Sequence, residues 1–116
     1  MFNHLKTKSE LREAITLLRK VEYSLRMKQW SHYVCDLVNE HAYATYHYGI
    51  GDLIVSEIRH RIAGEFSIGE WLRNHHKIGV GMDRPEFDRS DEMREYRIRW
   101  VNSMIDELTV ALKNKL

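Results

Sequence analysis

The chain of 116 residues has the length of one domain, which is enough to bury a single core without disulfides or metals. The chain has 18 Lys and Arg residues and 17 Asp and Glu residues, so its net charge is close to zero. This balance excludes a DNA mimic, which needs a strong acidic excess, and it is not the strong positive charge of a typical DNA-binding protein. One proline and six glycines, in a chain that is 43% hydrophobic, favour a few long helices over many short strands.

The N-terminal part of the chain predicts a long amphipathic helix over residues 8–28. Thr7 and Glu10 have the spacing of a capping box, in which a hydroxyl and a carboxylate satisfy free amides of the first helical turn. After them, apolar residues recur at intervals of three and four positions, which is the period of one helix face. These residues are Leu11, Ala14, Ile15, Leu18, Val21 and Leu25.

A second helix is expected over residues 31–48, because its apolar residues share one face when successive positions are placed 100° apart. His41 and Tyr48 belong to this apolar face and are expected to point toward the core. Tyr43 and His47 fall on the opposite side and are expected to point to solvent or to a partner.

Two glycines are expected to separate the second helix from a third. Gly49 and Gly51 are predicted to end the second helix, since glycine accepts the left-handed backbone geometry of a C-terminal cap. Asp52 has the residue type of an N-cap, and it predicts a third, shorter helix that ends at Gly64.

The C-terminal half predicts a short helix, a loop and the longest helix. A second capping box, Ser67 with Glu70, opens the short helix, and residues 79–90, with the only proline, form the loop. Ser90 is expected to cap the last helix, whose apolar stripe continues almost to its end. The elements together predict an all-α protein, a single-domain bundle of about five helices over residues 1–116.

His41 is the most informative single residue, because it stands in an apolar stripe between Leu37 and Tyr48. Most histidines in such positions are neutral, hydrogen-bonded core residues. The alternative is a small-ligand pocket lined by His41 and Tyr48, in a protein that sequesters that ligand.

No catalytic group, metal site or cofactor site is predicted, and the protein is expected not to be an enzyme. Asp36, Glu40 and His47 share one side of the second helix, but polar residues are the usual outer face of a helix and no H-E-x-x-H motif is present. Cys35 falls in the middle of a helix beside the apolar stripe, where cysteine behaves as a small hydrophobe.

Nucleic-acid binding is an alternative function. Arg59 and Arg61 on the third helix, with Arg73 and Lys77 on the fourth, are the candidate phosphate contacts. Residues 51–100 nevertheless hold nine Lys and Arg against ten Asp and Glu, and phosphate-driven affinity needs a more uniformly positive surface.

Protein–protein binding is the preferred function class. The chain has three Trp and six Tyr, residue types that are enriched in interfaces. The expected partner-binding residues come from the loop and the last helix. They are Arg84, Phe87, Arg89, Arg94 and Arg97. A homodimer through the apolar stripe of the last helix, around Trp100 and Met104, is a further expectation.

Two segments of the C-terminal half, SIGEWLRNHHKIGV and MREYRIRWVNSMIDEL, resemble small uncharacterised proteins encoded by bacteriophages and prophages. Those proteins typically show a capped Trp-Leu turn, a His-Gly/Lys-Ile element, a short acidic loop and an Arg-x-x-Trp helix with apolar residues to its end. The matching positions are Ser67, Trp71, Leu72, His76, Ile78, Arg97, Trp100 and Ile105. The resemblance implies an accessory phage protein that binds and modulates or inhibits a host enzyme of defence or nucleic-acid processing, and it implies no reaction.

The sequence also predicts where the protein acts. The first ten residues lack an apolar signal core, and no apolar run is long enough to cross a membrane. A single cysteine fits a reducing compartment. The cytoplasm of a bacterial host is therefore expected, without a membrane partner.

Overall fold

A computed structural model describes residues 5–27, 34–65 and 91–115, and these residues form helices without any strand. The four helices found there are α1 (Lys8–Arg26), α2 (Val34–Thr45), α3 (Tyr48–Glu65) and α5 (Asp91–Lys113). The predicted all-α class is confirmed, with one helix fewer than expected in the described ranges. The predicted short helix from Ser67 and the loop 79–90 lie outside those ranges. None of the described helices is long and apolar enough to cross a membrane.

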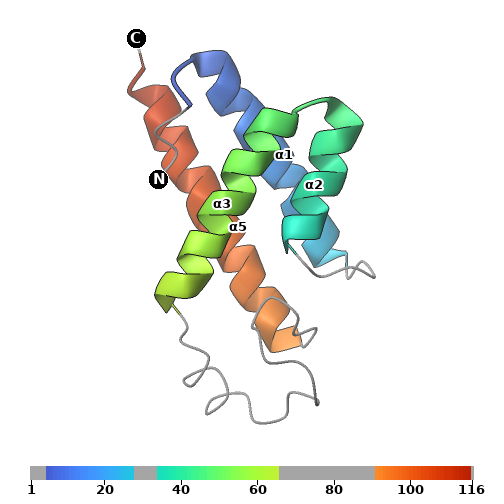
Figure 1. Ribbon diagram of the computed structural model, residues 1–116. Helices are drawn as coiled ribbons and strands as arrows, with labels where there is room; N and C mark the ends of the chain where they lie inside the picture. Colours follow the sequence, from blue (N-terminus) through green and yellow to red (C-terminus); the bar gives the residue numbers. More distant parts are fainter. Residues whose placement is uncertain (1–4, 28–33, 66–90, 116) are drawn as a thin grey trace.

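The helices pack around a shared core, with α1 at its centre. Figure 1 shows α1 and α5 side by side and running in opposite directions, and this pair makes the most extensive contact. α2 packs on α3, and α1 contacts both of them. The buried apolar face of α1 contains all the residues that its periodicity predicts. These predicted residues are Leu11, Ala14, Ile15, Leu18, Val21 and Leu25, and Leu17 is buried beside them.

The predicted capping box opens α1. The amide of Thr7 donates to Glu10 Oε1 at 3.2 Å, and the amide of Glu10 donates to Thr7 Oγ1 at 3.1 Å. Two amides of the first turn that have no partner within the helix are thereby satisfied. The helix ends at Arg26, with Met27 as its C-cap, close to the predicted end at residue 28.

α2 ends earlier than predicted, and a tyrosine takes the position expected for glycine. The amide of His47 donates to the carbonyl of Ala42 at 2.9 Å, and the amide of Tyr46 donates to the carbonyl of Tyr43 at 3.4 Å. These are the two hydrogen bonds of a Schellman C-cap, whose left-handed residue is Tyr46, with a φ of 60°. α3 then starts at Tyr48, so the predicted end of the second helix at 48 and start of the third at 52 are wrong.

Gly49 and Gly51 lie at the start of α3, and Gly51 serves helix packing rather than a chain reversal. The amide of Gly51 donates to the carbonyl of His47 at 2.9 Å, which begins the hydrogen bonding of α3. A Cβ atom at Gly51 would lie 2.7 Å from the Cβ of Ala42, whereas a Cβ at Gly49 would meet nothing within 4 Å. α2 and α3 therefore approach each other closely at Gly51, which brings the end of α2 against the start of α3.

The apolar stripe of α5 packs inside the chain. Trp100, Val101, Met104 and Leu108 are all buried. Trp100 and Met104 are therefore not available to a homodimer interface, because these side chains already form part of the core that α5 shares with α1, and a homodimer through other residues of the last helix stays a prediction.

Long polar side chains connect α3 to α5. Arg61 Nη2 donates to Glu107 Oε2 at 2.6 Å, and Arg61 Nη1 donates to Ser103 Oγ at 3.3 Å. On its own helix, Arg61 Nε lies 3.1 Å from Glu57 Oε1. One guanidinium group thus joins carboxylates from two helices.

Candidate interaction site

Three exposed tyrosines meet at the corner between α2 and α3. The side chains of Tyr43, Tyr46 and Tyr48 are 72%, 80% and 47% exposed. The rings of Tyr43 and Tyr48 lie 5.5 Å apart between centroids, and those of Tyr46 and Tyr48 lie 6.3 Å apart. Both pairs are edge-to-face, with interplanar angles of 82° and 81°. We call these three residues the tyrosine cluster.

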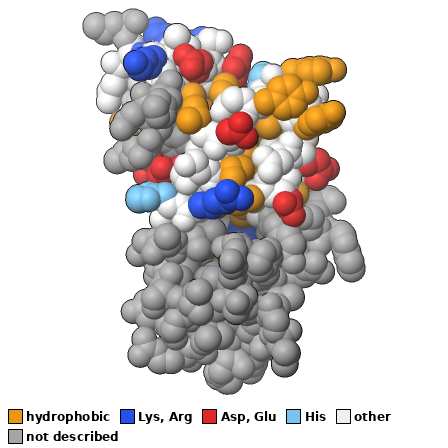
Figure 2. Space-filling view, in the orientation of Figure 1, with side chains coloured by type: hydrophobic (Ala, Val, Ile, Leu, Met, Phe, Trp, Pro, Cys, Tyr) orange, Lys and Arg blue, Asp and Glu red, His pale blue; other side chains and the backbone are white. Residues whose placement is uncertain are grey.

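The backbone of the corner explains why the rings meet. Tyr43 belongs to the last turn of α2, Tyr46 is the left-handed residue of its C-cap, and Tyr48 is the first residue of α3. Since only two residues separate the helices, side chains from both are brought to one surface. Figure 2 shows hydrophobic side chains, a class that includes tyrosine, gathered at the upper right, over the end of α2 and the start of α3.

The surroundings of the tyrosine cluster are acidic. Residues 29–58 contain no Lys or Arg, and Glu40 and Asp52 are exposed. Glu40 precedes Tyr43 by three positions and Asp52 follows Tyr48 by four, spacings at which side chains are neighbours on a helix. In Figure 2, acidic side chains lie around the hydrophobic group, and the Lys and Arg side chains lie apart from it.

The sequence predicted part of this corner. The exposure of Tyr43 is confirmed, but the prediction that Tyr48 points to the core is wrong, because Tyr48 starts a new helix instead of continuing α2. His47 is half-buried and lies 3.9 Å from Glu13 of α1, so it faces this helix. Tyr46 was not singled out, although three tyrosines in six positions within a stretch without Lys or Arg were a usable signal.

His41 forms the hydrogen bond that its position in the sequence predicts. Its Nε2 lies 3.0 Å from Ser24 Oγ of α1, and the imidazole is half-buried. This bond joins α1 to α2 on the side of the core. His41 is therefore a hydrogen-bonded residue at the edge of the core rather than at its centre.

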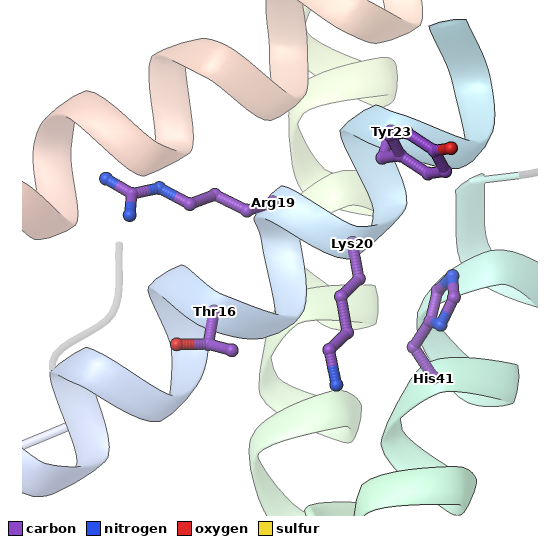
Figure 3. Close-up of a pocket in the computed structure, with 5 residues that line it drawn as sticks. All are labelled: Thr16, Arg19, Lys20, Tyr23 and His41. Carbon is purple, nitrogen blue, oxygen red and sulfur yellow. The ribbon is translucent and has the colours of Figure 1, made fainter. Parts of the chain in front are cut away.

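An open depression of about 360 Å³ lies beside His41, between α1 and α2. Its lining residues come mostly from α1. They are Thr16, Arg19, Lys20, Tyr23 and His41. Figure 3 shows Lys20 and Tyr23 on the side of His41, whereas Arg19 extends away from it. Tyr48 does not line this depression, so His41 and Tyr48 do not share it as predicted.

The two arginines of the last helix that were expected to bind a partner are not on the surface. The side chains of Arg94 and Arg97 are only 7% and 1% exposed, and both take part in interactions within the protein. The prediction that they form an exposed patch is wrong, because their positions on α5 face the interior. The other expected partner-binding residues, Arg84, Phe87 and Arg89, lie outside the described residues.

The set of residues predicted to contact nucleic acid also loses a member. Arg61 is held by Glu57 and Glu107, and its side chain is 18% exposed, so it is not available to phosphates as predicted. Arg59 is exposed, as that alternative requires. The remaining two residues of this set, Arg73 and Lys77, lie outside the described residues.

Metal ligands are not gathered in the described part of the chain. No group of three or more His, Cys, Asp or Glu side chains that could hold a metal ion occurs there. Asp36, Glu40 and His47 therefore do not form a ligand set. Cys35 is half-buried and packs against the core.

Comparisons of the chain with protein-family models, with curated proteins and with solved structures gave no match.

Proposed function

We propose that this protein acts by binding another protein at the tyrosine cluster, without catalysing a reaction. The observation that supports the proposal is the exposure of three tyrosines in mutual contact at one corner. Tyrosine offers a large contact area for little loss of conformational entropy, which makes it a frequent hot-spot residue. The three side chains expose on the order of 400 Å² in total, the size of the functional patches that soluble proteins carry.

The backbone of Tyr46 adds support for a role in binding. A left-handed conformation costs a residue with a Cβ atom about 1–2 kcal/mol, and glycine would avoid that cost. The side chain of Tyr46 is the most exposed of the three, so burial offsets little of the strain. Strain of this kind concentrates at functional sites.

A more specific proposal follows from the resemblance of the C-terminal half to phage and prophage proteins. On that basis, the partner is a protein of a bacterial host, such as a defence or nucleic-acid-processing enzyme, and binding modulates or inhibits it in the cytoplasm. Nucleic-acid binding is the weaker alternative, since Arg61 is engaged within the protein and the tyrosine cluster has an acidic rim.

The proposal is tested by affinity capture from a nuclease-treated bacterial lysate. Three proteins are compared: the natural chain, a triple variant with Tyr43, Tyr46 and Tyr48 replaced by Ser, and the control Tyr23→Ser. Tyr23 is a matched control because it is exposed and belongs to α1, which contributes no ring to the tyrosine cluster. We expect one host protein to be retained by the natural chain and the control and lost from the triple variant.

Two results would contradict the proposal. One is equal retention of the same protein by the natural chain and the triple variant. The other is retention that depends on nucleic acid and disappears after nuclease treatment. The melting temperature of the triple variant is measured alongside, and we expect little change, because Tyr43 and Tyr46 are largely exposed and Tyr48 is about half exposed.

A further inference from the structure

We infer that the partner presents arginine or lysine side chains to the tyrosine cluster, so that the site binds a basic segment of a protein chain. The inference rests on the proposed function and specifies the chemistry of the partner. It is carried by the juxtaposition of three exposed aromatic rings with exposed carboxylates on both helices, two on α2 and one on α3.

The carboxylates and the rings form two lines that meet at the corner. On α2, Asp36, Glu40 and Tyr43 follow one another at intervals of four and three positions, so they lie along one side of the helix. On α3, Tyr48 and Asp52 are four positions apart. The contact of Tyr43 with Tyr48 joins the two lines at the end of α2.

The carboxylates of this surface are not neutralised from within. Asp36, Glu40 and Asp52 are exposed, and in the described ranges none of them takes part in an ion pair. No Lys or Arg occurs between residues 29 and 58, so neither α2 nor the first part of α3 supplies a cation. The surface therefore has a negative potential that attracts positive charge.

Both parts of the surface favour the same ligand chemistry. The face of an aromatic ring attracts a cation, by about 0.5–1 kcal/mol at exposed sites and by about 2 kcal/mol where water is excluded. Carboxylates bind guanidinium groups through charge-assisted hydrogen bonds. Since the tyrosine rings are nearly perpendicular to one another, their faces point in different directions and offer more than one place for a cation.

Other occupants fit this surface less well. An apolar partner would remove water from Glu40 and Asp52 without providing hydrogen bonds, which is costly for a carboxylate. A nucleic acid or an acidic segment would be repelled by the same carboxylates. A second copy of this chain would have to present the exposed Lys and Arg side chains of α1, and this case is one outcome of the test.

A displayed library of random peptides tests the inference. The library is selected on the natural protein, and each enriched peptide is tested against the triple tyrosine variant and against Tyr23→Ser. We expect the enriched peptides to contain more Arg and Lys than the starting library, and to bind Tyr23→Ser but not the triple variant.

The outcomes separate the inference from the function on which it rests. Peptides that need the tyrosines but have no excess of Arg or Lys would overturn the inference and leave protein binding intact. An absence of enriched peptides, or peptides that bind the triple variant equally, would overturn both. Self-association of the natural chain that disappears in the triple variant would identify a second copy as the occupant and overturn the inference of a basic segment from another protein.

A defined probe provides a second measurement that does not depend on selection. A synthetic peptide of alternating Arg and Ser is titrated into the protein, with the Lys–Ser and Glu–Ser peptides for comparison. We expect binding in the order Arg, Lys, Glu, and about tenfold weaker binding of the Arg peptide by the double variant Glu40→Gln, Asp52→Asn. Equal binding of the Arg and Glu peptides, or no effect of the double variant, would overturn the inference.

Discussion

Tyr46 occupies the backbone position at which many helices have glycine. Its φ of 60° places a bulky residue in the left-handed region, and its 80% exposed side chain gains little from burial. We expect Tyr46→Gly to raise the free energy of unfolding by roughly 0.5–1 kcal/mol, because the release of strain exceeds the loss of the ring contact with Tyr48. Urea denaturation monitored by circular dichroism measures this change.

Tyr43→Gly is the matched control for this prediction. Tyr43 is nearly as exposed and also contacts Tyr48, but it lies within α2. Glycine in a helix costs about 1 kcal/mol, so this variant should lower the free energy of unfolding. If both variants destabilise the protein by the same amount, the ring contact of Tyr46 stabilises the fold more than its backbone strain destabilises it. The prediction for Tyr46→Gly would then be wrong.

At the scale of helices, the packing of α2 on α3 depends on a missing side chain. Gly51→Ala places a Cβ atom 2.7 Å from the Cβ of Ala42, and neither atom can rotate away. We expect this variant to lower the free energy of unfolding by about 1–3 kcal/mol, although alanine is the better helix former. The melting temperature should fall accordingly.

Two further variants identify the cause of this destabilisation. Gly49→Ala adds the same methyl group two residues earlier, where nothing lies within 4 Å, so it should stabilise the protein by about 0.5–1 kcal/mol. Adding Ala42→Gly to Gly51→Ala removes the opposing Cβ and should recover part of the lost stability. Loss of stability in Gly49→Ala, or no recovery in the double variant, would mean that steric contact is not the cause.

The sequence predicted what depends on neighbours along the chain. The capping box of Thr7 and Glu10 and the buried face of α1 involve residues three or four positions apart, and both are present as predicted. The boundary between α2 and α3 was missed because the role of Gly51 lies in its contact with Ala42, nine positions earlier in the chain. The misplaced boundary also reversed the predicted orientation of Tyr48.

The candidate site was harder to predict, because burial depends on the tertiary fold. Arginine is almost always exposed, so Arg94 and Arg97 were assigned to a surface that they do not reach. Arg61 was assigned to a nucleic-acid surface because its ion pair with Glu107 joins positions far apart in the sequence. The tyrosine cluster requires the turn at Tyr46, and a tyrosine in a glycine position gives no local signal for that turn.

At the scale of the molecule, the interactions that hold the fold and the surface proposed for binding are separate. The core is built on α1, whose apolar face packs on α5 and on the pair of α2 and α3. The tyrosine cluster contributes little buried area to that core, since its three side chains are exposed. Changes at the cluster should therefore alter binding more than stability, which is the usual relation for binding surfaces.

The hydrogen bonds of Arg61 join α3 to α5, and their contribution to the stability of the fold can be tested. α3 and α5 make less contact with each other than α1 makes with either of them, and the long side chain of Arg61 bridges them. We expect Arg61→Met to lower the free energy of unfolding by about 1–2 kcal/mol, because partly buried charge-assisted hydrogen bonds are lost. Urea denaturation at low and high salt measures the loss.

The matched control is Arg26→Met, which removes the exposed ion pair of Arg26 with Glu22 on α1. Exposed pairs of this spacing contribute only about 0.3–0.5 kcal/mol, and salt screens them. The effect of Arg61→Met should therefore be the larger and should persist at high salt, while that of Arg26→Met should disappear. Equal and salt-sensitive effects would mean that Arg61 behaves as a surface residue. Arg61 would then again be a candidate phosphate contact, as the nucleic-acid alternative requires.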